Sequence, residues 1–310
     1  MRTGFLFLDL GLKDNSKLAA ILIAIVFVLF GCAREAVEKP PVEMPTHEVR
    51  DDLGRSVRVP PTIDRAISLA PSLTEMIFAI GAGDKLVGVT TYCNFPAEAA
   101  AIEKVGDTQT PNIERIIALK PQVVFVSTAS QLEAFTRTLN EQGISVYVTN
   151  PASLDDVFRD LKQLGDLFGT NTQAESVVAS LGARVDRVKQ GAGGSQRPRV
   201  FVQISNEPLF TIGRDSFLTR LVELAGGESV PKDVATAYPK LSKETAAALD
   251  PDVIILSDSE DNRNPSSVFR DSKAVKKSRV YRINADILSR PGPRLVDALE
   301  EISAKLKEEK

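Results

Sequence analysis

The chain has 310 residues, with 38 Lys and Arg against 41 Asp and Glu, so its formal net charge is −3 at pH 7. This balance provides no basic field and excludes nucleic acid as an expected partner. Because the chain contains only two cysteines, its stability has to come from packed apolar cores rather than from a disulfide framework.

A short apolar run near the start predicts export from the cytoplasm. Residues 18–30 are all apolar and follow three basic residues. The run is shorter than the ~20 residues of a transmembrane helix and fits the apolar core of a signal peptide. Leu29-Phe30-Gly31-Cys32 resembles the bacterial lipobox, in which the cysteine is lipidated after cleavage. We therefore predict a lipoprotein signal peptide over residues 1–31 and a membrane-anchored protein, periplasmic or on the outer cell surface. The alternative is an uncleaved anchor with an incidental cysteine.

The next segment is rich in charge and proline. Residues 32–48 contain few large apolar side chains, which predicts a disordered tether that gives the protein reach from the membrane. Residues 51–60 then have the pattern of a small hairpin with its turn at Gly54. The only histidine, His47, falls in the tether, which excludes a metal site of several histidines and a serine–histidine triad within the fold.

Strand and helix patterns alternate over the following hundred residues. The expected strands cover residues 66–69, 86–89, 123–126 and 146–148, and the expected helices cover residues 74–80 and 112–119. Such alternation predicts parallel βα units. We assign residues 49–152 to an N-terminal α/β lobe.

A long helix follows this lobe. Apolar residues from Ala174 to Val188 recur at helical spacing, and the run stops at Gly191. We assign residues 153–194 to a linker that contains this backbone helix, and residues 195–310 to a C-terminal α/β lobe. That lobe has expected strands at 200–204, 253–256 and 280–283 and a last helix over about 294–307. One stiff helix as the only covalent link permits only a small opening between lobes.

Two distant stretches of the chain match without a gap. In residues 114–125 and 244–255, a glutamate opens a helical turn, a proline ends it, and a β-branched apolar run follows. Chance is the alternative, because such turns are common in α/β proteins. Internal repetition predicts an α/β fold of two similar Rossmann-like lobes, with parallel-rich sheets, one long helix between them and a ligand cleft between the lobes.

Several blocks carry a family resemblance. The segment from Ile67-Ser68-Leu69-Ala70-Pro71 to Cys93-Asn94-Phe95-Pro96 resembles the helical-backbone (class III) substrate-binding proteins of bacterial ABC importers. The resemblance runs from about Asp51 to the C-terminus. It is nearest to the cobalamin-binding branch, mainly through Thr91-Tyr92-Cys93 and the late Arg290-Pro291-Gly292-Pro293-Arg294.

This resemblance implies a function. We expect an extracytoplasmic lipoprotein that captures cobalamin or a related corrinoid and delivers it to an ABC importer. A binding protein for a ferric siderophore or haem is the alternative. It stays open because the cobalamin-binding relatives present tryptophan where this chain has Thr108 and Tyr238, and the chain contains no tryptophan. The implied partners are a permease dimer with its ATPase subunits and a small-molecule metal chelate, and we expect the binding protein to be a monomer without a cofactor of its own.

The resemblance also implies site residues. Tyr92 from the first lobe, Phe210 and Tyr238 from the second, and Asp286 and Arg290 before the last helix are expected to face the ligand. The alternatives are half-buried surface tyrosines and a core phenylalanine. Glu114 and Glu244 are expected to dock on arginines of the permease, and the alternative is a solvated glutamate near a helix N-terminus.

An enzyme or a signalling adaptor is a second class of function. It would need a catalytic constellation, and the sequence contains neither a phosphate-binding loop nor a nucleophile elbow. Cys93 is the one candidate thiol or metal ligand in the fold, and a small, partly buried cysteine is the alternative reading. We therefore expect no enzymatic activity, no catalytic residues and no metal-ligating residues.

Overall fold

The computed structural model describes residues 46–127, 132–192 and 197–308. The predicted signal peptide, Cys32 and nearly all of the predicted tether lie outside these residues. Within the described ranges, none of the helices combines the length and the apolar character that a membrane crossing requires.

The described chain begins with a hairpin. Strand β1 (His47–Arg50) pairs antiparallel with β2 (Ser56–Val59), and Gly54 in the turn has a φ of 74°. His47 and Glu48 therefore belong to this hairpin, which corrects the predicted end of the tether at residue 48. The physical reason is that Val59 is fully buried, so the hairpin is held in place by the core and β1 gains ladder hydrogen bonds.

The N-terminal lobe is built on a parallel sheet with the strand order β4-β3-β5-β6. Its strands are β3 (Ala66–Ser68), β4 (Leu86–Val89), β5 (Val123–Ser127) and β6 (Ser145–Thr149). Along β5, Val123 and Phe125 pack on one side of the sheet, and Val124 and Val126 pack on the other. Both faces are thus covered, as the continuous apolar runs predicted.

Helices form the two outer layers of this lobe. They are α2 (Pro71–Ala79), α3 (Ile113–Ala118), α4 (Leu132–Glu141) and α5 (Leu154–Phe168), with short 3-10 turns η1 (Gly83–Lys85) and η2 (Ala97–Ala101). The ring of Phe168 at the end of α5 lies 5.4 Å from that of Phe125 in β5. Helix α5 therefore packs on the N-terminal sheet, and only the helix after it links the lobes.

The C-terminal lobe repeats this sheet. Its parallel strands are β7 (Arg199–Ser205), β9 (Glu228–Val230), β10 (Val253–Asp258) and β11 (Val280–Asn284). Strand β7 lies between β9 and β10, and β11 follows β10, so β9-β7-β10-β11 matches β4-β3-β5-β6. The short antiparallel strand β8 (Phe210–Thr211) is an addition next to β7.

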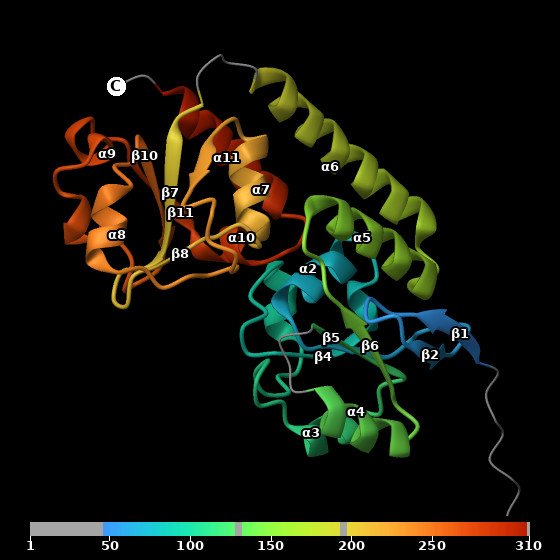
Figure 1. Cartoon of the computed structure of the whole chain (residues 1–310). Coiled ribbons are helices and arrows are strands. Elements are labelled where there is room, and N and C mark those ends of the chain that lie inside the picture. The colour runs from blue at the N-terminus through green and yellow to red at the C-terminus, as the bar shows by residue number, and fades with distance from the viewer. Residues whose placement is uncertain (1–45, 128–131, 193–196, 309–310) are drawn as a thin grey trace, which may run out of the picture. The chain divides into compact units, whose positions relative to one another are not determined.

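The helices of the second lobe follow the same plan. They are α7 (Phe217–Leu224), α8 (Lys243–Ala248), α9 (Lys273–Lys276), α10 (Ala285–Ser289) and α11 (Leu295–Lys307), with the 3-10 turn η3 (Ser267–Phe269). Figure 1 shows the sheet of this lobe with α8 and α9 on one side and α7 and α11 on the other. The internal repeat is confirmed in detail, because α3 and α8 are each six residues long and each is capped by a side chain, Asn112 or Ser242. Each is followed by a positive φ, 48° at Lys120 and 38° at Asp250.

Helix α6 (Asn171–Gly191) joins the two halves and contains the predicted helical run. Its 21 residues span about 30 Å at 1.5 Å per residue. Gly165 of α5 makes close packing possible, because a Cβ at that position would lie 2.5 Å from the Cβ of Ala174 in α6. At the other end, the Arg184 guanidinium lies 2.6 Å from Asp297 and 2.5 Å from Glu300 of α11.

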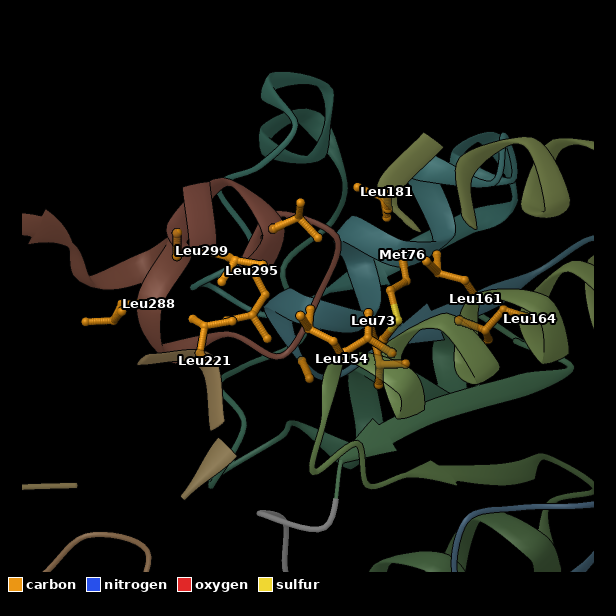
Figure 2. Packing of buried hydrophobic residues seen from close by; sticks show 14 of the residues in the cluster. Leu73, Met76, Leu154, Leu161, Leu164, Leu181, Leu221, Leu288, Leu295 and Leu299 are labelled. Carbon is orange, nitrogen blue, oxygen red and sulfur yellow. The ribbon is translucent and has the colours of Figure 1, made fainter. Parts of the chain in front are cut away.

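A single apolar cluster runs through both lobes. It contains Leu73 and Leu161 from the N-terminal lobe, Leu181 from α6, and Leu221 and Leu295 from the C-terminal lobe (Figure 2). Opening the lobes widely would expose part of this cluster to water, at about 25 cal/mol per Å² of apolar surface.

These contacts predict a stiff molecule. We expect spin labels at Asn140→Cys and Lys276→Cys to give one narrow distance distribution that shifts by less than about 2 Å when a ligand is added. The measurement uses a Cys32→Ala chain, since the other native thiol, Cys93, is buried. Two resolved distances, or a shift of many ångströms, would show that α6 does not hold the lobes at a fixed separation.

Candidate functional site

The candidate site lies where parallel strands end. Tyr92 follows β4 and Tyr238 follows β9, and these two strands occupy the same place in the two sheets. Tyr92 is 59% exposed and Tyr238 is 43% exposed. Ligands of open α/β sheets bind beyond the carboxyl ends of the strands. The repeat thus places one exposed tyrosine at the expected position in each lobe.

Small polar side chains hold the loop that carries Tyr92 on its buried side. The Tyr92 amide donates to the Thr90 hydroxyl at 3.3 Å, and the Cys93 Sγ lies 3.1 Å from the hydroxyls of both Thr74 and Thr90. Cys93 is buried, with 2% of its surface exposed. The thiol therefore belongs to a buried hydrogen-bonded cluster that fixes the base of the loop, and it is more deeply buried than the partly buried cysteine of the alternative interpretation.

The loop that carries Tyr238 is held against the segment after β8. Gly213 donates its amide to Ala237 O at 3.0 Å, and a Cβ on Gly213 would lie 2.1 Å from Thr236 O. Only glycine fits there. Desolvation raises the pKa of the Tyr238 hydroxyl, and its hydrogen bond with the Ser216 side chain acts in the opposite direction. Ser216 is buried, so this contact brings the hydroxyl against the lobe, although Tyr238 as a whole is 43% exposed.

Phe210 lies in β8 and is half-buried. Its backbone bridges to Lys240, two residues after Tyr238. The structure therefore places Phe210 beside the Tyr238 loop, and the side chain is neither fully buried core nor fully exposed.

Asp286 and Arg290 are joined to the N-terminal lobe. The Arg290 guanidinium donates to Asp286 Oδ1 at 2.7 Å, to Asn94 Oδ1 at 2.7 Å and to Glu75 Oε1 at 3.2 Å. Asn94 Nδ2 also donates to Asp286 Oδ2 at 2.9 Å. Arg294 donates to both oxygens of Glu75 at 2.9 and 2.5 Å. We call Glu75, Asn94, Asp286, Arg290 and Arg294 the interlobe cluster.

Sequence reasoning missed Glu75 and Asn94 as functional candidates. A signal for Glu75 was available, because it stands among Leu73, Met76 and Ile77 in a helix whose other residues are mostly apolar. Acidic side chains are almost never fully buried unless they are paired. A glutamate in that setting should have prompted a search for basic partners, and the two late arginines were the candidates.

Glu114 and Glu244 occupy equivalent places in the repeat. Both are exposed, and each lies in the first turn of its helix, α3 or α8. Glu244 accepts hydrogen bonds from its own backbone amide and from the Ser242 side chain, which lower the pKa of its carboxyl. Glu244 thus makes the local contacts expected of a solvated glutamate near a helix N-terminus. It also remains accessible to a partner.

The described residues also form hollows elsewhere. One of about 580 Å³ lies among α5, α6 and α7 and is lined by Leu154, Phe158, Val185 and Leu221 among others, with none of the five predicted ligand residues. Within the described ranges, no three His, Cys, Asp or Glu side chains are grouped closely enough to hold a metal ion.

Comparisons with known proteins agree with this architecture. The protein-family model described as "Periplasmic binding protein" matches residues 67–287. An uncharacterized ABC transporter substrate-binding lipoprotein of Bacillus subtilis (strain 168), YvrC, is 30% identical over 306 residues, which is 94% of this chain and 97% of that protein.

Two solved structures have the same fold. The crystal structure of the periplasmic vitamin B12 binding protein BtuF of Vibrio cholerae has a TM-score of 0.71 and 30% identity, covering 79% of this chain and 97% of that one. A possible iron-binding periplasmic solute-binding protein from Staphylococcus epidermidis has a TM-score of 0.69 and 26% identity, covering 80% of this chain and all of that one.

Proposed function

The chain belongs to the periplasmic binding proteins, and on this premise we propose that it captures cobalamin or a related corrinoid outside the cytoplasm and delivers it to an ABC importer. As a substrate-binding protein of an ABC importer, it works with permease and ATPase subunits. The family binds solutes and is not a family of enzymes. Similarity to a vitamin B12 binding protein over 79% of the chain supports the corrinoid.

One observation carries the proposal. The described residues contain four exposed large hydrophobic side chains, and three of them are the aromatic residues Tyr92, Phe95 and Tyr238. All three lie on the loops that follow the equivalent strands β4 and β9. Aromatic faces can cover a large planar ligand with little loss of rotamer freedom. We assign Tyr92, Phe210 and Tyr238 to contacts with the face of the ligand, and Asp286 and Arg290 to its polar edge.

The proposal includes a route to the importer. Lipidation of Cys32, after removal of residues 1–31, would keep the protein at the membrane, as the name of the B. subtilis relative suggests for that protein. The exposed pair Glu114 and Glu244 would then meet one permease subunit each, since their equivalent places in the repeat suit a partner with two-fold symmetry.

The second candidate is a ferric siderophore or haem. It is favoured by the absence of tryptophan from the chain and by the similarity to a possible iron-binding protein from S. epidermidis. Such chelates are also large and rich in π or carbonyl groups, so the same aromatic loops would serve them.

A calorimetric titration tests the proposal. We expect cyanocobalamin to bind the purified chain one to one with a submicromolar dissociation constant, roughly −8 kcal/mol or better. Tyr92→Ala should weaken binding by about 1–3 kcal/mol, because it removes an aromatic contact face. Leu53→Ala is the matched control, since Leu53 is 47% exposed but lies in the hairpin turn.

Haemin and ferrichrome are titrated in parallel. Heat with either of them and none with cyanocobalamin would overturn the corrinoid and establish the second candidate. Equal losses of ligand affinity in Tyr92→Ala and Leu53→Ala would show that Tyr92 is not part of the binding site.

A further inference from the structure

The interlobe cluster is balanced in charge, and its centre at Glu75, Arg290 and Arg294 is largely shielded from water, whereas Asp286 and Asn94 lie at its exposed edge. It combines two carboxylates, Glu75 and Asp286, with two guanidinium groups, Arg290 and Arg294. The Glu75 side chain is 2% exposed, and those of Arg290 and Arg294 are 13% and 18% exposed. A buried charge is tolerated only where it is paired and hydrogen-bonded. Glu75 is therefore the buried carboxylate that pairs with both arginines of the cluster, Arg290 and Arg294.

These arginines also hold the loop of the N-terminal lobe that presents Tyr92. Arg290 donates to Tyr92 O at 3.3 Å and to the Asn94 side chain at 2.7 Å. The Arg294 guanidinium lies over the Phe95 ring, 4.1 Å from its centroid. Three of the four residues from Tyr92 to Phe95 thus contact an arginine from the other lobe. The position of this loop is set jointly by both lobes.

The segment between the arginines fits closely against α2. A Cβ on Gly292 would lie 3.5 Å from Ser72 Cα and 3.6 Å from a Glu75 carboxylate oxygen. The hydrogen bond with Glu75 is the main cause that raises the pKa of Arg294. The segment from Arg290 to Arg294 therefore lies against the first turns of α2 with both its charged ends on Glu75.

We propose that Glu75 is a positioning residue: by pairing with Arg290 and Arg294 it couples the separation of the lobes to the position of the loop from Tyr92 to Phe95. This inference rests on the proposed function, because the loop matters to transport only as part of the ligand site. It assigns to Glu75 a role in binding although its carboxylate is buried and turned away from solvent. It also makes Arg290 a contact between the lobes, since three of its hydrogen bonds go to Glu75, Asn94 and Tyr92 of the N-terminal lobe.

Hydrogen–deuterium exchange on the ligand-free full chain in detergent tests the coupling. We expect Glu75→Gln to speed amide exchange in residues 90–96 and 286–294 by about 10-fold or more, while β5 and β10 keep their protection. Arg184→Gln is the matched control. It also removes an arginine that bridges two carboxylates, Asp297 and Glu300, but that arginine lies between α6 and α11.

Asn94→Ala provides a second variant that leaves the core intact, because Asn94 is exposed. It removes one link to Arg290 and one to Asp286, so we expect a smaller increase in exchange confined to residues 90–96. Unchanged exchange at residues 90–96 in both Glu75→Gln and Asn94→Ala would overturn the proposal. An equal increase in Arg184→Gln would also overturn it, since the effect would then be a general loss of stability.

The affinity arm uses whichever of cyanocobalamin, haemin and ferrichrome binds the wild type. We expect Glu75→Gln to weaken that probe about 10-fold, mainly through faster dissociation, and Arg184→Gln to leave it unchanged. Faster exchange with unaltered affinity would overturn the link to binding. The exchange arm needs no ligand, so failure of all three probes would count against the proposed function and leave the test of Glu75 in place.

Discussion

Replacing Glu114 and Glu244 together by lysine should abolish uptake while ligand affinity stays normal. Each glutamate is exposed in the first turn of α3 or α8, and the repeat presents the two at equivalent places. Losing one partner of a desolvated charge pair costs about 2–5 kcal/mol, so each alanine variant should lower complex formation by ~30-fold or more. Charge reversal adds repulsion, and the double variant loses the anchor on both lobes.

The uptake assay needs a control with the same change of charge. Glu141→Lys combined with Glu175→Lys serves, because both residues are exposed and lie on α4 and α6, away from the repeated turns. Uptake by cells, binding to the permease and calorimetry on the isolated protein are compared for the two double variants. Normal uptake by the Glu114 and Glu244 variant, at equal expression, would return both residues to the role of solvated helix glutamates.

The second large effect concerns stability and pH, and it comes from Asp160 in α5. This side chain is fully buried, and its pKa is raised to about 7, first by desolvation and then by the charge of Asp52. Arg159 opposes the shift by donating to Asp160 Oδ1 from Nε at 3.2 Å and from Nη2 at 2.8 Å. The other oxygen, Oδ2, has no hydrogen-bond partner among the described residues.

The raised pKa of Asp160 determines how the free energy of unfolding changes with pH. Because the pKa of Asp160 is higher in the folded state than the ordinary 3.8, the folded protein keeps a proton that the unfolded chain has lost between those two values. The free energy of unfolding therefore falls as pH rises, by about 1.4 kcal/mol per pH unit in that window, and levels off above the folded pKa. At pH 8 the free energy of unfolding is therefore lower by on the order of 4 kcal/mol than at a pH below the ordinary pKa of the carboxyl.

Asp160→Asn isolates this contribution. We expect its stability relative to wild type to rise by roughly 2–3 kcal/mol between pH 5 and pH 8, because asparagine does not titrate. Urea unfolding at several pH values measures the difference. Asp155→Asn, an exposed change on the same helix, is the control for loss of a carboxylate. Parallel curves for Asp160→Asn and wild type would show that Asp160 does not titrate in this range.

Most of the fold was predictable because its signals are local. The repeat around Glu114 and Glu244, with its helix caps and prolines, appears in the structure as matching helices and strands. The helical run from Ala174 to Val188 lies inside α6. Hydrophobic period and turn residues act over a few positions, so a single sequence records them well.

The boundaries of the tether and of the linker differ from the prediction, because tertiary contacts and not local signals set them. The predicted tether extends over the first two residues of β1, since nothing local distinguishes a charged spacer from an edge strand that is held by its neighbour. Helix α5 was assigned to the linker, but its packing on Phe125 and Tyr147 ties it to the N-terminal sheet.

The candidate site shows the same division. Tyr92 and Tyr238 were predicted from the family resemblance, and the structure finds both exposed on loops after equivalent strands. Their contact with a ligand stays a prediction. An acidic residue in an apolar helix indicates that Glu75 needs a basic partner, but Glu75 lies 215 positions before Arg290, and no local pattern specifies the hydrogen bonds between them.

The sequence by itself therefore determined two α/β lobes, their repeat and the helix between them, since these follow from spacing along a few turns of chain. Only the tertiary structure decided which charges meet. Glu75 joins the arginines at 290 and 294, and Asp160 loses its water, because folding brings distant segments together and removes solvent around them. No periodicity in the chain records such pairings, and their energies depend on burial that exists only in the folded protein.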